Sequence, residues 1–267
     1  MFDGRRHVNF LEVPDLEVKI TTDINEVREA QQLRFRVFNL ELGRGLQASY
    51  EKNVDFDDFD PYCEHVIVRD AKSKEVVGTY RLLLGSRARA NIGFYSEREF
   101  DLQNIRNLDG EVLELGRSCA RKDFRDRALI PLMWETIAQY VKNHQVRYLF
   151  GCASLYTMEA KEVSACFSFL KRNYYAPEEL RVHPLSSCEC PDVDDNLALM
   201  DEQAIFLKLP SLIKSYLRLG AVVCGAPALD REFGTADFFM LLDIHKLSRE
   251  YLNRFGLMGA KVRNAVG

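Results

Sequence analysis

The sequence contains no apolar run that approaches the roughly 18 residues needed to span a bilayer. It contains no internal repeat and no long low-complexity linker, and its first residues, MFDGRRHVNF, lack the apolar segment of a signal peptide. Its seven cysteines, an odd number without framework-like spacing, fit a reducing compartment better than a disulfide scaffold. These absences disfavour a membrane-spanning, repeat or disulfide-stapled protein, and we expect a cytoplasmic one.

The sequence also has little net charge, −4 at pH 7 over 267 residues, so we expect no nucleic-acid partner. Metal-ligand patterns are weak, because the C-x-C pair of Cys188 and Cys190, with His183 nearby, has no second Cys or His pair. A surface loop is the commoner origin of such a pair, and we expect no metal. His65 and His144 are expected to have structural or surface roles.

Strand-like and helix-like segments alternate along the chain. Strands are predicted at 16–21, 64–70, 75–84, 111–116, 146–153 and 236–244. Helices are predicted at 24–42, 128–144, 157–172, 209–220 and 245–256. The alternation predicts an α/β sandwich in which helices flank a central mixed β-sheet. We expect a single domain over residues 1–267, with the C-terminal segment at about 203–255 integral to it.

Charged residues crowd the end of the strand predicted at 111–116. The stretch LELGRSCARKDFRDR, residues 113–127, places four arginines and a lysine before an apolar helix. A helix N-terminus flanked by arginines can hold a phosphate group, although a solvated basic turn is the plainer alternative. Upstream, Arg81 lies in an apolar strand and therefore needs a carboxylate partner, which Glu114 or the acidic loop NVDFDDFDPYC could supply. That loop could also seat an ammonium group or a cation, or merely solvate a turn.

In order along the chain, LRFRVF, DDFD, GTYRLL and LELGR resemble the acyl-homoserine-lactone synthases and related GNAT-like N-acyltransferases. The longer segments DPYCEHVIVRD, LELGRSCARKDFRDRALIPLMW and SYLRLGAVVCGAPALDREFGTADFFMLLDI resemble the ornithine-acyl carrier protein N-acyltransferases, a group also labelled hemolysins. The resemblance implies an acyltransferase that moves a fatty or 3-hydroxy fatty acyl group from acyl carrier protein to the α-amine of an amino acid. Ornithine, which would give a lyso-ornithine lipid, is the family's best-known acceptor, and other amino acids fit the same chemistry.

The resemblance also assigns residues. The family's motif positions correspond here to Arg34 and Phe38 on the first helix, Asp57 and Asp60 in the acidic loop, Arg81, and the pair Glu114 and Arg117. Glu114 is the expected base for the amine, directly or through a water. Arg34, Arg81 and Phe38 are expected to bind the acceptor. Asp57 and Asp60 either act on the acceptor or only anchor the arginines as structural ion pairs.

One departure from the GNAT pattern bears on the donor. A loop that grips coenzyme A usually reads R-x-x-G-x-G, whereas residues 125–130 read RDRALI, with Ala128 and Ile130 in the glycine places. Side chains there would crowd a diphosphate yet leave a helix N-terminus able to take the single phosphate of a phosphopantetheine arm. We therefore expect the phosphopantetheine thioester of acyl carrier protein as donor and no bound cofactor. The residues expected to hold the carrier and its arm are Arg117, Ser118, Cys119, Arg121, Arg125 and Arg127.

Several alternatives stay open at this point. Backbone N–H groups near Ser118 and Cys119 are expected to stabilise the oxyanion, and a nucleophilic Cys119 is the less favoured possibility. Phe100, Met133, Trp134 and Phe150 are candidates for an acyl pocket, although core packing would explain them equally well. An acetyl-CoA-dependent amine acetyltransferase is the alternative function, and the missing glycines argue against it. A peripheral contact with the inner-membrane surface through the lipid product is a further expectation.

Overall fold

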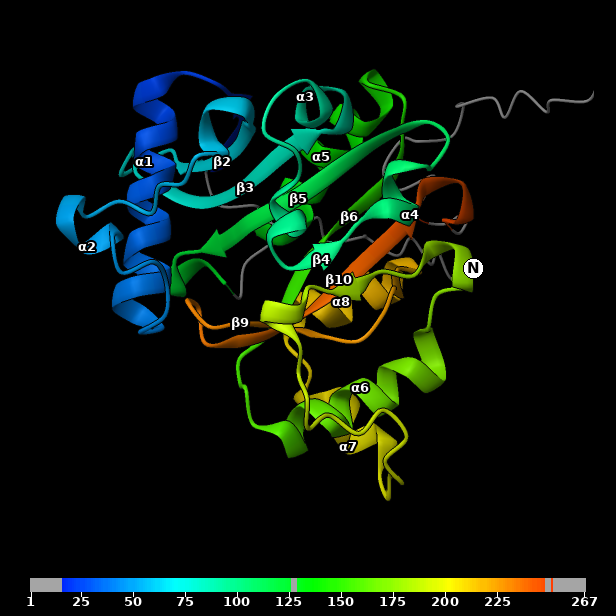
Figure 1. Cartoon of the computed structure of the whole chain (residues 1–267). Helices are drawn as coiled ribbons and strands as arrows, with labels where there is room; N and C mark the ends of the chain where they lie inside the picture. Colours follow the sequence, from blue (N-terminus) through cyan, green and yellow to red (C-terminus); the bar gives the residue numbers. More distant parts are fainter. Residues whose placement is uncertain (1–15, 126–128, 248–250, 252–267) are drawn as a thin grey trace, which may run out of the picture.

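The computed structural model describes residues 16–125, 129–247 and 251. An eight-stranded mixed sheet forms its centre, in the order β1-β2-β3-β5-β6-β10-β8 with β9 pairing β10 (Figure 1). These strands are β1 (Leu16–Thr21), β2 (Glu64–Asp70), β3 (Val76–Leu84), β5 (Glu111–Ala120), β6 (Val146–Leu155), β8 (Val222–Val223), β9 (Ala228–Asp230) and β10 (Thr235–Asp243). Two short strands, β4 (Phe100–Asp101) and β7 (His183–Pro184), pair separately.

Helices cover both faces of this sheet, which confirms the predicted GNAT-like sandwich (Figure 1). The α-helices are α1 (Ile24–Phe35), α2 (Ser49–Lys52), α3 (Gly85–Ala90), α4 (Gln103–Arg106), α5 (Leu129–Asn143), α6 (Ala160–Tyr174), α7 (Glu202–Lys208) and α8 (Ser211–Leu219). A π-helical segment η1 (Arg36–Glu41) continues α1, and short 3₁₀ turns include η3 (Tyr95–Arg98) and η7 (Ile244–Lys246). The helix predicted at 245–256 lies largely outside the described residues.

Strand β3 shows why both faces must be covered. Every residue from Val76 to Leu83 is buried, as expected for a strand that packs against helices on either side. One face packs against α5, α6 and α8 in the larger core, and the other packs beneath α1 and the segments around α3 and η3. Helix α1 begins where Asp23 accepts hydrogen bonds from the backbone N–H groups of Asn25 and Glu26.

Strands β5 and β6 diverge in the middle of the sheet, and this divergence creates the site. They pair in parallel only from Glu111 to Glu114, although β5 continues to Ala120 and β6 to Leu155. Gly151 lies where they part, and a Cβ atom there would come within 2.3 Å of the backbone oxygen of Leu115. A larger residue would therefore push the two strands apart at the wrong place.

Strand β5 is longer than the sequence suggested. The residues Arg117–Ala120, expected to begin a turn, continue the strand, and Cys119 and Ala120 pair with β3. The pairing register shifts between Thr79 and Arg81, and Arg117 adopts a left-handed backbone conformation with φ of 51°. This is a β-bulge, which changes the direction in which side chains point along a strand. It explains how Glu114 and Arg117, three residues apart, both reach the same cavity.

Candidate active site

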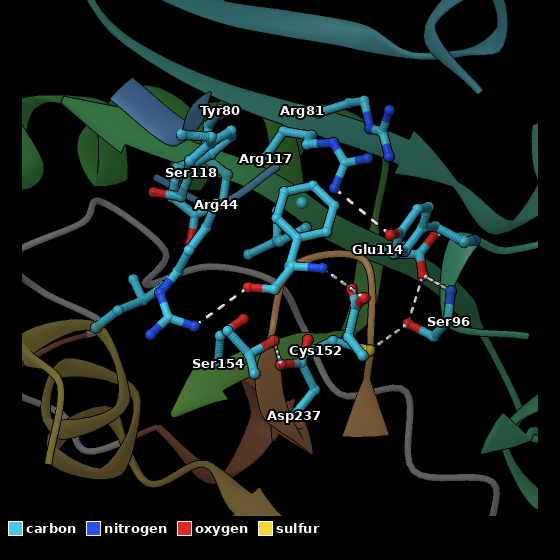
Figure 2. Close-up of a pocket in the computed structure, with 18 of the residues that line it drawn as sticks. Arg44, Tyr80, Arg81, Ser96, Glu114, Arg117, Ser118, Cys152, Ser154 and Asp237 are labelled. Atoms are coloured by element: carbon cyan, nitrogen blue, oxygen red, sulfur yellow. Dashed lines mark hydrogen bonds between the residues drawn. The ribbon is translucent and has the colours of Figure 1, made fainter. Parts of the chain in front are cut away.

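An open cavity of about 1020 Å³, including the part open to solvent, lies where β5 and β6 diverge (Figure 2). Because the strands part, side chains from both sheet faces reach it. Arg81 and Glu114 come from the face beneath α1 and η3, while Tyr80 and Tyr216 come from the face beneath α5 and α8. The cavity therefore passes through the sheet and can hold a long, narrow substrate across it.

Glu114 lies at the wall of this cavity and is almost fully buried, with 5% of its surface exposed. Its carboxylate accepts hydrogen bonds from the backbone N–H groups of Tyr95 and Ser96, both at 2.8 Å, and from the Ser96 hydroxyl at 2.6 Å. Burial raises the pKa of Glu114, and these hydrogen bonds only partly offset that effect. A buried carboxylate with a raised pKa, fixed in one orientation, has the properties of a general base.

Arg117 lies between two aromatic rings on the same cavity wall. Its guanidinium carbon is 4.8 Å from the ring centroids of both Tyr95 and Phe233. Phe38, on the π-helical segment η1, contacts Phe233 edge-on at 6.1 Å and also lines the cavity. The predicted motif residues Phe38, Arg117 and Glu114 are thus brought together.

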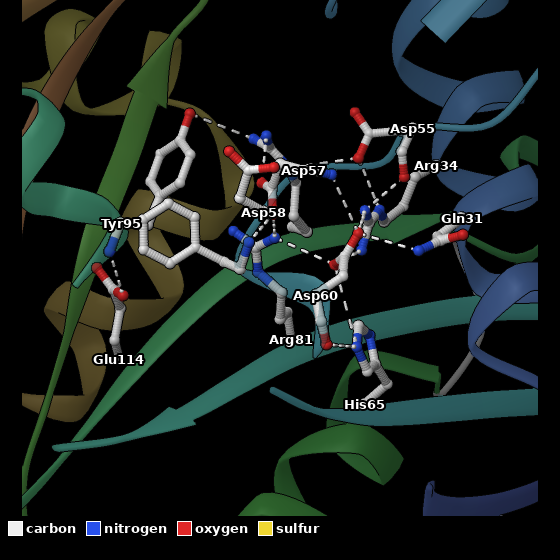
Figure 3. Close-up of polar contacts among 12 residues, drawn as sticks. Gln31, Arg34, Asp55, Asp57, Asp58, Asp60, His65, Arg81, Tyr95 and Glu114 are labelled. Carbon is white, nitrogen blue, oxygen red and sulfur yellow. Dashed lines mark hydrogen bonds and ion pairs between the residues drawn. The ribbon is translucent and has the colours of Figure 1, made fainter. Parts of the chain in front are cut away.

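The acidic loop binds the arginines in a buried network (Figure 3). Asp57 bonds Nη1 of Arg81 at 2.5 Å and Nη2 of Arg117 at 3.0 Å. Asp60 bonds Arg81 at 3.1 Å and Arg34 at 2.8 Å, and Arg34 also bonds Asp55 at 2.7 Å. Burial alone would raise the pKa values of Asp57 and Asp60, but the neighbouring arginine charges outweigh it and lower both.

This network argues against the expected role of Arg34 in binding the acceptor. It also favours one of the two roles expected for Asp57 and Asp60. Arg34 is fully buried, forms no part of the cavity wall, and gives four hydrogen bonds to Asp55 and Asp60. It cannot reach an acceptor there. Asp57 and Asp60 also lie outside the cavity lining, in the anchoring position that was one of their two predicted roles. Arg81 does line the cavity.

The residues expected to hold the acyl carrier and its arm lie in different parts of the structure. Ser118 lines the cavity, whereas Cys119 packs beneath α1 with Ala30 and Leu33. Burial raises the pKa of the Cys119 thiol to about 12, which removes it as a nucleophile. Arg121 and Arg125 lie at the surface beyond the cavity and pair with acidic side chains: Arg121 with Glu75 and Asp123, and Arg125 with Glu41. Arg127 lies outside the described residues.

Of the residues expected to line an acyl pocket, two line a cavity and two are packed in the cores. Phe100 and Met133 are packed in the two cores, where they line none of the cavities found among the described residues. Trp134 and Phe150 line a second, narrow apolar cavity of about 20 Å³. This apolar cavity shares Leu115 and Tyr216 with the main one. Phe100 and Met133 are therefore core residues, because neighbouring side chains bury them completely. The sequence alone does not distinguish an apolar residue of the core from one that lines a tunnel.

Several cavity residues escaped the sequence analysis. Tyr95 and Ser96, which hold Glu114, lie in a loop segment without any motif. Arg44 donates hydrogen bonds to the backbone oxygens of Phe233, Gly234 and Tyr156, and so fastens the β9–β10 hairpin over the cavity. Other missed residues, Tyr216, Asp230, Phe233 and Asp237, fall within the C-terminal segment SYLRLGAVVCGAPALDREFGTADFFMLLDI, whose family resemblance was the available signal.

The predicted structural roles of the histidines are consistent with their positions. His65 is buried beside the backbone oxygen of Asp60, and burial lowers its pKa to about 4. His144 stacks on Tyr140 at 4.0 Å. Among the described residues, one group of three potential metal ligands converges, namely Glu99, Cys152 and Asp237, and it does not include Cys188, Cys190 or His183.

Comparison with known proteins agrees with this geometry. The acetyltransferase (GNAT) domain model matches residues 33–135, the part that includes the acidic loop, β3 and β5. An L-ornithine N(alpha)-acyltransferase of Brucella abortus is 34% identical over 91% of this chain and 90% of its own length. The chain belongs to the L-ornithine N(alpha)-acyltransferase family. This membership confirms the predicted family and the acyltransferase class.

Solved structures show the same fold at low sequence identity. An N-acyl amino acid synthase from uncultured soil microbes, FeeM, has a TM-score of 0.51 at 11% identity, covering 87% of this chain and 93% of that one. A CoA-dependent acyl-homoserine lactone synthase, MesI, has a TM-score of 0.50 at 10% identity, covering 90% of this chain and 93% of that one. No helix among the described residues is long and apolar enough to cross a membrane.

Proposed function

We propose that this protein transfers a fatty or 3-hydroxy fatty acyl group from acyl carrier protein to the α-amine of ornithine, giving a lyso-ornithine lipid. The relatives of this chain are named L-ornithine N(alpha)-acyltransferases, which supports ornithine as the acceptor. The buried carboxylate of Glu114 at the wall of the main cavity supports removal of a proton from the acceptor's amino group. The acceptor's α-ammonium loses a proton to Glu114, directly or through a water, and the resulting amine attacks the thioester carbonyl. After the attack the nitrogen gives up a second proton, and the leaving thiolate takes up a proton. The C–N bond forms, the C–S bond breaks, and the carrier's thiol leaves without a covalent enzyme intermediate.

The acceptor's α-carboxylate has a suitable partner in Arg81. The hydrogen bonds that Arg81 gives to Asp57 and Asp60 use Nη1. Its Nε and Nη2 atoms lie within 4 Å of the point that a Cβ atom on Gly116 would occupy, at the cavity wall. A guanidinium fixed on one side by aspartates can present its other edge to a carboxylate. A carboxylate bound there would leave the α-amine in the cavity that Glu114 also lines.

The fatty chain has a route on the opposite face of the sheet. Tyr80 and Tyr216 share a hydrogen bond between their hydroxyls at the junction of the main cavity with the apolar one. Beyond this pair, the apolar cavity is lined by Trp134 and Phe150, and a third one continues along Trp134 towards Ile137. Apolar walls of this kind suit an acyl tail, with the thioester left between β5 and β6.

Acyl carrier protein is the donor that the sequence supports best, because Ala128 and Ile130 replace the glycines of a coenzyme A loop. The fold does not decide this point, since the CoA-dependent synthase MesI has it too. Any contact with the inner-membrane surface would follow from releasing a lipid product.

The deciding experiment offers the purified chain ornithine with each of five acyl donors and identifies products by mass spectrometry. Palmitoyl or 3-hydroxypalmitoyl acyl carrier protein with ornithine should give Nα-acylornithine. The same acyl groups on coenzyme A should be used with at least about tenfold lower kcat/KM. Equal use of both donors would overturn the carrier assignment. Transfer from acetyl-CoA, with no long-chain product, would favour the alternative of an amine acetyltransferase.

A further inference from the structure

A second group of acidic side chains, separate from the acidic loop, converges beside the main cavity. Glu99 follows η3, Asp237 lies on β10, and a carboxylate oxygen of each lies within 4.8 Å of the other and of Sγ of Cys152. Both carboxylates belong to residues that are 5% exposed. Asp237 and Cys152 line the main cavity (Figure 2). Asp230 lines it too, whereas Glu99 is not part of the lining and lies beside Asp237 and Cys152.

These carboxylates lack the arginines that neutralise the acidic loop. Among the described residues, no lysine or arginine forms an ion pair with Glu99, Asp230 or Asp237. Oε2 of Glu99 is buried and has no hydrogen-bond partner. Burial, together with the charge of Asp230, raises the pKa of Asp237 to about 6, and burial raises the pKa of Glu99 as well. Charged carboxylates without a positive partner are costly to bury, and either a bound proton or a bound cation relieves that cost.

We infer that Glu99 and Asp237 bind the side-chain ammonium of the acceptor amino acid, so that they select a dibasic acceptor such as ornithine. This inference rests on the proposed function and names the part of the site that reads the acceptor's side chain. It replaces Asp57 and Asp60 in that role, because Arg81, Arg34 and Arg117 already occupy those two carboxylates.

The position of the group relative to Glu114 fits this role. The Ser96 hydroxyl donates to Glu114, and Sγ of Cys152 donates to the same hydroxyl at 3.4 Å. A serine and a cysteine thus separate the carboxylate expected to deprotonate the α-amine from the acidic pair. The short methylene stem of ornithine can span side chains that lie so close, with one amine at each end.

The chemistry favours an ammonium over a metal ion. Burial raises the pKa of the Cys152 thiol, and a thiol must lose its proton to ligate a metal. The thiol instead donates its hydrogen to Ser96. An ammonium needs only acceptor oxygens at hydrogen-bond distance, and Oε2 of Glu99 is one that nothing else uses.

The test compares ornithine with norvaline, which has the same carbon stem but no side-chain ammonium. The purified full chain, with acyl carrier protein loaded with palmitate as donor, should prefer ornithine in kcat/KM. Asp237→Asn should raise the KM for ornithine by about tenfold or more, the usual effect of losing one charge-assisted hydrogen bond, and leave norvaline nearly unchanged. Glu99→Gln should act in the same direction, and Glu232→Gln, at an exposed position of the same hairpin, should change neither constant.

The outcomes separate the two levels of the argument. If wild type acylates no amino acid, the proposed function fails. If it acylates ornithine but the variants keep the wild-type preference over norvaline, this inference alone is overturned. Cobalt titration of wild type gives an independent measurement: a thiolate-to-cobalt absorption band that Asp237→Asn abolishes, with activity lost to a chelator and restored by metal, would show a metal site and overturn the inference. An unchanged spectrum and chelator-resistant activity support the ammonium site.

Discussion

Glu114 meets two requirements of a general base that often conflict. It is held by three hydrogen bonds, which fixes its direction, yet it lies at a cavity wall where a substrate amine can reach it. A carboxylate oxygen can accept more than one hydrogen bond, so the bonds from Tyr95 and Ser96 leave lone pairs for the amine. Burial raises its pKa, and a higher pKa makes a carboxylate a stronger base as long as it stays deprotonated.

Replacing Glu114 with Gln should lower kcat by about 10²–10⁴-fold, the usual effect of losing a general base. Gln can keep the hydrogen bonds from Ser96, but its amide group opposes the N–H of Tyr95, so we also expect a loss of roughly 1–3 kcal/mol in the free energy of unfolding. Single-turnover rates measure the first effect and urea unfolding the second. Turnover within a few fold of wild type in a folded variant would remove Glu114 from the mechanism.

The pH profile of the wild type provides a second check on Glu114. A general base works only when deprotonated, and the pKa of Glu114 lies above the ordinary value of 4.5. The acid limb of kcat/KM should therefore fall as pH drops through a value above 4.5, and Glu114→Gln should lack that limb. A limb that persists in the variant would have to come from another group, such as Asp237, whose pKa is raised to about 6.

At the scale of elements, the acidic loop fastens three parts of the fold together. It joins α1 through Arg34, β3 through Arg81 and β5 through Arg117. The sequence predicted that Arg81 needs a carboxylate and that the acidic loop could supply one, and both expectations are confirmed. Spacing alone could not decide whether Asp57 and Asp60 face an arginine or the cavity, because that depends on where β3 and β5 carry their arginines.

Asp60→Asn should therefore destabilise the protein instead of changing the acceptor preference. Removing one member of a buried ion-pair network leaves arginine charges without compensation and costs roughly 3–5 kcal/mol. Chemical unfolding at pH 7 measures this loss. Asp58→Asn is the matched control, because Asp58 is exposed. Its Oδ2 lies 3.7 Å from Nη2 of Arg98, and a surface ion pair of this kind contributes about 0–1 kcal/mol.

The pH dependence of stability should reveal the same network. The pKa of Asp60 is lowered in the folded protein, so its stabilisation is complete above its unfolded pKa of about 4 and is lost as pH falls towards the lower folded pKa. Wild-type unfolding free energy should decline steeply below about pH 4, and the Asp60→Asn variant should decline less. Parallel curves for the two proteins would mean that Asp60 contributes no such linkage.

For the molecule as a whole, strands with a clear apolar pattern could be predicted from the sequence. The bulge at Arg117 and the divergence of β5 and β6, which form the cavity, could not. The strand predicted at 16–21 matches β1, and that at 64–70 matches β2, because apolar residues and turn signals mark their ends. The bulge at Arg117 was missed, since an arginine-rich stretch resembles a turn when its pairing with β3 is unknown. The divergence of β5 and β6 likewise depends on which strands pair over long distances in the sequence. Gly151, which has no side chain at the point where the strands part, is a local sequence feature that fits this divergence.

An acidic acyl carrier would dock on the molecule's surface, where the arginines that follow β5 are candidates for contact with it. Arg121 and Arg125 follow the end of β5, and acidic neighbours already neutralise part of their charge. The double variant Arg121→Glu and Arg125→Glu should therefore raise the KM for acyl carrier protein by about tenfold or less, and it should weaken the rise of that KM with salt. Its kcat and its KM for ornithine should stay close to wild type, because neither arginine lines the cavity.

The matched control reverses two exposed lysines elsewhere, Lys161→Glu on α6 and Lys208→Glu on α7. Helix α6 packs near β8, at the opposite end of the sheet from α1 (Figure 1). Both double variants change net charge equally, so a general repulsion of the acidic carrier would raise KM in both. A rise confined to the arginine variant locates carrier docking at the surface around Arg121 and Arg125. Equal rises in both, or none in either, would show that these arginines serve only their local ion pairs and that the carrier docks elsewhere.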